Sequence, residues 1–366
     1  MNNTISLCLI AKNEEQRIPN LFGSLKIGEP DSVIDEVILV DTGSTDKTKE
    51  VAASYGNTVK VYDFEWIDSF EAARNYSYSK STMAWQFWLD CDDILKDRDY
   101  KALVQLKNEK LIDNNVKVIS MLYDYGFNTS GEPTLTLERN RMSRKEINAK
   151  WIGVVHEYVD TFGNPVLKTD IRISHTRNHS NGTRNLDIFN SMIEKGIELN
   201  DRDNYYYAKE LYYNGLFDKA EKQLLTVLDR GNWFEEKLQT IIALAEIYRS
   251  RKNWKAEREI CYKSFEYDTP RSEFLYRIGD SFFNEGKYRI ALEWYRRALR
   301  TPVPTYASYL NKEYYTWLPA LQMCLCYYKL GDTKHAIEYN SLAYTYNPKH
   351  PSILHNMEFF KSLDNK

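Results

Sequence analysis

Three acids that follow a predicted buried strand are the strongest chemical signal in this sequence. Residues 85–89 form an apolar run, and Asp90, Asp92 and Asp93 come directly after it. Carboxylates this close repel each other unless a positive charge lies between them. A hard divalent cation, Mg²⁺ or Mn²⁺, that bridges a diphosphate meets this need. The alternative is that Asp92 and Asp93 cap a helix that begins just after them.

Two polar segments upstream also follow apolar runs. Residues 11–15 read Ala-Lys-Asn-Glu-Glu, and residues 41–46 read Asp-Thr-Gly-Ser-Thr-Asp. Asp41 can accept a hydrogen bond from a nucleobase or a ribose hydroxyl. Gly43 permits a tight turn, and the Ser-Thr pair after it can cap the next helix. Since ligands of parallel sheets bind at the carboxyl ends of strands, three acid-bearing strand ends predict a pocket for a nucleoside diphosphate.

Strand and helix signals alternate through residues 1–185. Short apolar runs predict buried strands, and apolar residues at helical spacing predict the helices between them. This alternation predicts an α/β domain with a mostly parallel, Rossmann-like sheet covered by helices. The expected strands are residues 5–10, 36–40, 59–64 and 85–89, and the expected helices are residues 18–25, 45–55 and 70–78.

Residues 186–366 follow a different pattern, with tyrosine, leucine and alanine at helical spacing and no strand runs. Four segments share a turn that ends in alanine, at Ala220, Ala256, Ala291 and Ala336. The first two intervals between these alanines match the helix–turn–helix unit of tetratricopeptide repeats, whose period is about 34 residues. The longer third interval includes a proline-containing loop. The pattern predicts a second, all-α domain of tetratricopeptide-like repeats.

Taken in order, the motifs resemble family 2 glycosyltransferases with the GT-A fold. They are A-K-N-E-E, V-D-T-G-S-T-D-K-T, A-A-R-N-Y, W-L-D-C-D-D and, from Trp151 to Glu157, W-I-G-V-V-H-E. The last is similar to a segment of one branch of that family. Some members of this branch extend lipopolysaccharide cores. Others carry tetratricopeptide repeats, including S-glycosyltransferases that modify bacteriocin peptides.

The resemblance implies a role for each matching residue. It places a metal on Asp92, with Asp90 at the ribose or a metal-bound water, and includes Glu157, the candidate base. With His175, which follows the last predicted strand, the predicted metal set is Asp92, Asp90 and His175. Asn75 would brace the pocket. The residues that it implies for nucleotide-sugar binding are Ala11, Asn13, Glu14, Asp41, Arg74, Asn75, Asp90 and Cys91.

Histidines and a glutamate in the later segments carry the remaining chemistry. In an inverting transfer a carboxylate deprotonates the acceptor while the nucleotide departs from the opposite face, and Glu157 is the candidate. The alternative is that Glu157 pairs with an arginine and His156 packs in the core. His175 or His179 would complete the metal shell, or both are surface histidines in a polar linker.

Composition excludes several other classes of protein. Of 366 residues, 43% are hydrophobic and 28% charged, which is typical of a folded chain. A net charge of −3 argues against a nucleic-acid-binding surface. No apolar run has transmembrane length, and residues 1–15 give no export signal. Five scattered cysteines predict reduced thiols in a cytoplasmic protein.

The predicted function is therefore inverting transfer of a sugar from a nucleotide-sugar, a UDP-hexose, to an acceptor. Whether the acceptor is a peptide side chain, S- or O-linked, or a lipopolysaccharide or surface polysaccharide stays open. A nucleotidyltransferase is disfavoured because residues 11–15 contain no glycine and are acidic. A non-catalytic scaffold is disfavoured by the intact Asp90, Asp92 and Glu157. The tyrosine-rich repeats offer a surface for the acceptor or for a homodimer.

Overall fold

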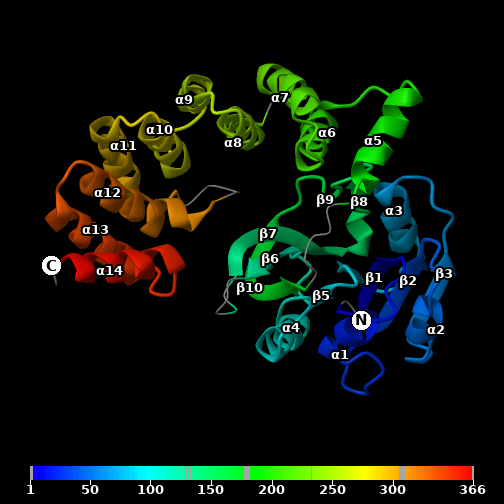
Figure 1. Cartoon of the computed structure of the whole chain (residues 1–366). Coiled ribbons are helices and arrows are strands. Elements are labelled where there is room, and N and C mark those ends of the chain that lie inside the picture. Colours follow the sequence, from blue (N-terminus) through cyan, green and yellow to red (C-terminus); the bar gives the residue numbers. More distant parts are fainter. Residues whose placement is uncertain are drawn as a thin grey trace. The chain divides into compact units, whose positions relative to one another are not determined.

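The computed structural model describes residues 3–127, 131, 133–176, 182–231, 233–304 and 310–364. The chain divides into two compact units, residues 1–191 and residues 192–366. Strands and helices alternate in the first unit, whereas the described part of the second is helical (Figure 1). The prediction of an α/β domain with a mostly parallel sheet, followed by an all-α domain, is confirmed. Within the described residues, no helix combines the length and apolar character that a membrane span requires.

A mostly parallel sheet forms the centre of the first unit. Its strand order is β3-β2-β1-β4-β7-β6-β10-β5, and a separate two-stranded sheet pairs β8 with β9. The apolar runs of the sequence give the buried central strands, since β1 and β2 are buried along almost their whole length. The strands are β1 (Ile5–Ala11), β2 (Glu36–Asp41), β3 (Val59–Asp63), β4 (Trp85–Trp88), β5 (Asp93–Ile94), β6 (Val118–Phe127), β7 (Pro133–Arg144), β8 (Lys150–Ile152), β9 (Tyr158–Asp160) and β10 (Val166–His175).

The pairing of the strands gathers the polar strand ends at one edge of the sheet. β1 runs parallel to β2 and to β4, with Ala11 beside Asp41. β10 runs antiparallel to β5, with His175 beside Asp93. The helices of this unit are α1 (Ile18–Ser24), α2 (Thr48–Ala53), α3 (Phe70–Lys80), α4 (Asp97–Glu109), the 3₁₀ helix Lys145–Ile147 and α5 (Arg184–Glu194).

Two expected helix caps are not formed. Helix α2 begins at Thr48, and its N-cap residue makes no side-chain cap, so the expected cap by Ser44 or Thr45 is wrong. Ser44 Oγ instead accepts a hydrogen bond from Asn13 N at 2.9 Å. The helix-cap alternative for the acids after β4 is also wrong, because Asp93 belongs to strand β5 and helix α4 begins only at Asp97.

The second unit consists of consecutive antiparallel helix pairs. The turns after α6, α10 and α12 contain Gly215, Gly286 and Gly331 at positive φ, a conformation that glycine adopts without steric cost. Three of the four turn alanines are fully buried, which lets the paired helices approach closely. The helices are α6 (Asp201–Tyr213), α7 (Phe217–Arg230), α8 (Phe234–Ser250), α9 (Trp254–Lys263), α10 (Ser272–Asn284), α11 (Tyr288–Arg300), α12 (Trp317–Lys329), α13 (Thr333–Tyr346) and α14 (Pro351–Asp364), with 3₁₀ helices at Ser264–Glu266 and Lys312–Tyr315.

Candidate active site

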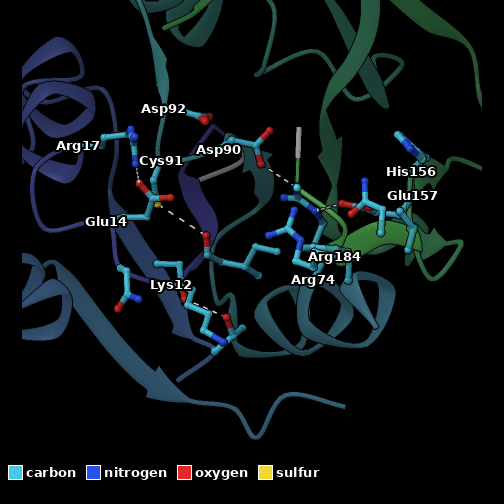
Figure 2. A pocket seen from close by; sticks show the side chains of 18 of the residues that line it. Lys12, Glu14, Arg17, Arg74, Asp90, Cys91, Asp92, His156, Glu157 and Arg184 are labelled. Carbon is cyan, nitrogen blue, oxygen red and sulfur yellow. Dashed lines mark hydrogen bonds and ion pairs between the residues drawn. The ribbon is translucent and has the colours of Figure 1, made fainter. Parts of the chain in front are cut away.

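A cavity of about 730 Å³ lies in the first unit where the polar strand ends meet. Its size is within the usual range of small-molecule sites. In Figure 2 the acids after β1 and β4 lie on one side of it together with Arg17, and Arg74, Arg184 and the segment before β9 lie on the other. The predicted site residues that line it are Ala11, Asn13, Glu14, Arg74, Asp90, Cys91, Asp92, Glu157 and His175, whereas Asp41 and Asn75 lie outside its lining.

Arg74, on helix α3, joins two of the predicted acids. Its Nη2 lies 2.6 Å from Asp90 Oδ1, and its Nε lies 2.6 Å from Glu157 Oε1. Burial alone would lower the pKa of Arg74, but the two carboxylates outweigh it and raise that pKa. Burial alone would raise the pKa of Asp90, but the Arg74 guanidinium holds it below its usual range. Asp90 therefore stands ionised beside a permanent cation.

Asn75 holds the segment that carries the predicted base. Its Nδ2 donates to Trp151 O at 3.0 Å, and its Oδ1 accepts from Trp151 N at 2.9 Å. One helical turn earlier, Glu71 Oε2 accepts from Gly153 N at 2.7 Å. Helix α3 thus supplies the hydrogen-bond partners of a segment that the main sheet does not pair. A bracing contact by Asn75 is present, although its side chain lies outside the cavity lining.

His156 and Glu157 differ in environment. The alternative of a packed core histidine is wrong, because His156 is exposed and has a φ of 55°. Glu157 does pair with an arginine, as its alternative proposed, and that arginine is Arg74. The ion pair with Arg74 uses only Oε1 of Glu157, and Glu157 lines the cavity. Pairing with Arg74 and a catalytic role for Glu157 are therefore compatible. Glu157 as general base stays a prediction.

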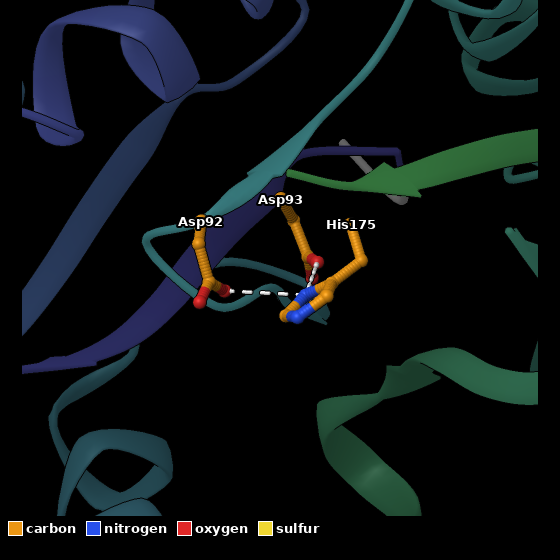
Figure 3. Close-up of side chains that lie close together, drawn as sticks. All are labelled: Asp92, Asp93 and His175. Atoms are coloured by element: carbon orange, nitrogen blue, oxygen red, sulfur yellow. Dashed lines mark ion pairs between the residues drawn. The ribbon is translucent and has the colours of Figure 1, made fainter. Parts of the chain in front are cut away.

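The second group of acids lies close to a histidine. Asp92, Asp93 and His175 each offer a ligand atom, and these atoms lie within 4.8 Å of one another (Figure 3). His175 Nδ1 is 3.5 Å from Asp92 Oδ1 and 3.6 Å from Asp93 Oδ1. Both carboxylate oxygens are buried without a hydrogen-bond partner in the described structure. Buried carboxylate oxygens left unsatisfied in this way fit a hard divalent cation.

The predicted metal set and this cluster overlap in Asp92 and His175. Asp90 is directed to Arg74 instead, and Asp93 takes the third place in the cluster. Tyr123 Oη lies 2.8 Å from His175 Nδ1, and the Tyr125 ring stacks on the imidazole at 4.9 Å. Burial would lower the pKa of His175, but the adjacent carboxylates raise it. The alternative ligand, His179, lies outside the described residues.

At the opposite end of the cavity, the segments after β1 and β2 bind each other. Asn13, with a φ of 58°, accepts from Thr45 N through its Oδ1 at 2.8 Å. Asp41 Oδ2 accepts from Gly43 N and Ser44 N, at 3.1 and 2.9 Å. Asp41 Oδ1 is buried and has no hydrogen-bond partner in the described structure. This acceptor lies next to the cavity and outside its lining, since Asp41 pairs with the lining residue Ala11.

Several residues of the cavity were not predicted. Tyr123 and Tyr125 are two residues apart on β6, so their side chains lie on the same face of the sheet. Phe70 precedes Arg74 by one turn of helix α3. These spacings are visible in the sequence, but only the fold shows which strand and helix faces meet at the cavity. The lining residues outside the predicted set are Ile10, Lys12, Arg17, Thr42, Trp66, Phe70, Tyr123, Tyr125, Val155, His156, Gly182, Arg184 and Asn185.

The metal-free protein is expected to lose stability as pH rises through 6. Burial and the charge of Asp90 raise the pKa of Asp92 to about 6. Folding then favours the protonated acid, so the free energy of unfolding is largest below pH 4 and falls by about 3 kcal/mol above pH 6. Thermal unfolding in EDTA at pH 5 and 7.5 measures about half of this difference, because the loss of stability begins near pH 4. Asp92→Asn should remove most of it and the exposed Asp97→Asn should not. Equal pH dependence in all three proteins contradicts the prediction.

Comparison with known proteins agrees with this arrangement. A SPbeta prophage-derived glycosyltransferase SunS from Bacillus subtilis is 23% identical over 232 residues, which are 60% of this chain and 51% of that protein. A TPR repeat-containing protein from Synechococcus elongatus is 36% identical over 91 residues, 25% of this chain and 21% of that protein. The chain thus spans about half or less of these curated relatives.

Among solved structures, a glucosyl-3-phosphoglycerate synthase from Mycobacterium tuberculosis, in complex with Mn²⁺ and UDP-glucose, is 20% identical with a TM-score of 0.38. That match covers 54% of this chain and 80% of that one. Residues 6–163 match the family model described as Glycosyl transferase family 2. This range contains every predicted nucleotide-binding residue and Glu157. Residues 6–163 are thus similar to glycosyl transferase family 2 domains over 43% of the chain.

Proposed function

We propose that this chain is an inverting, metal-dependent glycosyltransferase that moves a hexose from a UDP-sugar to an acceptor. One observation carries the proposal. A single cavity of the first unit holds an acidic cluster with an unsatisfied oxygen on Asp92 and a carboxylate, Glu157, bound by a buried arginine. These are the two kinds of group that such a transfer requires.

The donor would lie along the carboxyl ends of β1, β2 and β4. Asp41 lies beside Ala11, just outside the cavity lining, and its unused acceptor Oδ1 would meet a nucleobase N–H or a ribose hydroxyl there. Asn13 and Glu14 lie beside it at the end of β1. Arg74 keeps Asp90 ionised and in place between the two ends of the cavity. These residues would position the donor, and positioning lowers the barrier by removing the entropy cost of alignment.

The acid cluster would hold Mg²⁺ or Mn²⁺ through Asp92 and His175, with Asp90 close by. When bound, such an ion neutralises the negative charge that develops on the departing diphosphate. The unsatisfied Asp92 Oδ1 supports this assignment. A divalent ion would also remove the repulsion between neighbouring acids that burial makes expensive.

Glu157 would act as the general base. The acceptor's O–H or S–H proton passes to the Glu157 carboxylate as the acceptor atom forms a bond to the anomeric carbon. The bond from that carbon to the diphosphate oxygen breaks, and UDP leaves with the electron pair. Attack opposite to the leaving group inverts the anomeric configuration. Arg74, bound to Glu157 Oε1 at 2.6 Å, would orient the carboxylate for this step.

The acceptor is proposed to be a peptide side chain that binds the second unit. Exposed aromatic side chains of its helices support this proposal, among them Tyr213 and Trp233, whereas Tyr205 is buried in the repeat core. Stacked helical repeats commonly bind extended segments. The alternatives are a glycan acceptor and a homodimer formed through the repeats. In either case the exposed aromatic side chains would not bind a peptide.

Release of UDP from a panel of UDP-sugars with added Mn²⁺ tests the reaction class. One sugar should support release that EDTA stops and that excess Mn²⁺ restores. If no nucleotide-sugar is bound or cleaved with either metal, the chain is a scaffold and not a transferase.

Removal of the second unit is expected to separate the two substrates. A chain ending at Asn200 keeps helix α5, whose Leu186 and Phe189 are buried, and every cavity residue. A cut at Asn185 would remove that helix. UDP-sugar hydrolysis by residues 1–200 should persist at a rate within about threefold of the full chain, whereas transfer to the native acceptor should be lost. Full-rate transfer by the shorter protein would show that the repeats do not select the acceptor.

A further inference from the structure

Arg141, on strand β7, is a charged residue that the proposed reaction does not use. Its side chain is 0% exposed. The guanidinium carbon lies 3.8 Å from the Trp88 ring centre and 4.4 Å from the Tyr123 ring centre, so the cation is held between two aromatic faces. Burying such a group is costly unless an anion accompanies it.

That anion is Asp93, which is also 0% exposed. Arg141 Nη1 donates to Asp93 Oδ2 at 3.2 Å. The same oxygen accepts from the backbone N of Asp90 at 3.0 Å. The Asp93 carboxylate therefore stabilises the turn of residues 90–93 through its hydrogen bond to Asp90 N. Arg141 holds the same carboxylate oxygen in position. Strand pairing with His175 adds a second connection between Asp93 and the cluster.

The three acids after β4 are thus unequal. Asp90 faces Arg74 at 2.6 Å, and Asp93 faces Arg141 at 3.2 Å. Asp92 and Asp93 lie at similar distances from His175 Nδ1, 3.5 and 3.6 Å, but only Asp92 lines the cavity. Two buried arginines therefore compensate the two outer acids, and the middle acid is left directed toward a ligand.

We propose that Asp93 and Arg141 form a buried pair that positions the turn of residues 90–93, and that Asp93 is not a ligand of the metal. This inference rests on the proposed metal-dependent function. Of the three grouped residues, Asp92 and His175 would be ligands and Asp93 a positioning residue. The Asp93 carboxylate acts through its hydrogen bond to Asp90 N.

Two substitutions at Asp93 separate the roles. Asp93→Asn keeps an oxygen that can accept from Asp90 N but removes the charge that a metal prefers. Asp93→Ala removes both. Mn²⁺ binding in the presence of UDP, measured by electron paramagnetic resonance, should stay within about threefold of wild type in the Asn variant. It should weaken about 10- to 100-fold in the Ala variant, the range found for residues that orient metal ligands.

The outcomes are distinct. Equal, strong loss in both Asp93 variants, to the level of Asp92→Asn, would make Asp93 a ligand and overturn the inference. Unchanged binding in both would remove its positioning role. If the wild-type protein itself binds no Mn²⁺ with UDP, the metal step of the proposed function fails first, and the inference fails with it.

Arg141 is tested through its coupling to Asp93. Arg141→Met and Asp93→Asn should each lower the melting temperature, and the double variant should lower it by less than the two shifts combined, because it leaves no unpaired buried charge. Arg141→Lys, which retains the charge, should recover part of the loss. Additive shifts would show that the two residues act independently. Should Asp93→Asn fail to fold, the double variant carries the same Mn²⁺ comparison.

Discussion

Replacement of Glu157 by glutamine is expected to lower the turnover number for sugar transfer by about two to four orders of magnitude, the usual contribution of a general base. Glutamine retains an oxygen that can accept from Arg74 Nε, the contact that Glu157 makes at 2.6 Å. The substitution therefore removes the proton acceptor with little change in the cavity wall. Affinity for the UDP-sugar should barely change, because the contacts of Glu157 lie away from Asp41 and Asp92.

Steady-state rates at saturating donor, together with calorimetric donor binding, measure these two effects. Asp160→Asn is the matched control, since Asp160 lies on the adjoining strand β9 and outside the cavity lining. Near-normal turnover by the Glu157 variant would assign the base elsewhere. The acids to examine then are those that line the cavity, Glu14 and Asp90, and not Asp124 or Asp160, which lie outside it.

The second large effect is expected from Asp92→Asn. If Asp92 is the main acidic ligand, the affinity for Mn²⁺ and for the UDP-sugar measured with Mn²⁺ should fall about 100-fold or more, which corresponds to about 2.7 kcal/mol. Asparagine is isosteric and neutral, and Asp92 Oδ1 has no hydrogen-bond partner to lose in the described structure. The fold should therefore remain, with a melting temperature in EDTA at least equal to that of wild type at pH 7.5.

Isothermal titration with Mn²⁺ and with UDP, separately and together, measures this loss. Asp97→Asn, an exposed acid at the start of α4, is the matched control and should bind as wild type does. Donor binding that is unchanged in EDTA, in the wild-type protein, would show that the acid cluster does not act through a metal.

The sequence was sufficient for the elements whose signal is local. The apolar run at residues 5–10 became β1, and the acids after residue 89 lie at a strand end because parallel strands must end at the same edge. The sequence predicts that helix α2 begins at residue 45, three residues before its first residue in the structure, Thr48. The hydroxyl expected to cap it, that of Ser44, binds Asn13 on the neighbouring strand end instead. A contact across the sheet replaced a local cap.

Contacts between distant segments could not be predicted in this way. The sequence around Asp90 and Glu157 does not indicate that both bind Arg74. Asp90 is 16 residues from Arg74 in the chain, and Glu157 is 83 residues from it. Arg141 has the same difficulty. In the sequence it is one arginine among several in a strand, and only the packing of β4 and β6 on either side of it reveals its burial.

The hydrogen bonds from helix α3 to the segment before β9 give that segment a distinct behaviour in solvent exchange. The amides of Trp151 and Gly153 donate to the side chains of Asn75 and Glu71. Their protection against deuterium uptake therefore depends on side chains of one helix and not on the ladder of the main sheet. Exchange at these two positions reports how often the wall carrying Glu157 separates from helix α3, independently of global unfolding.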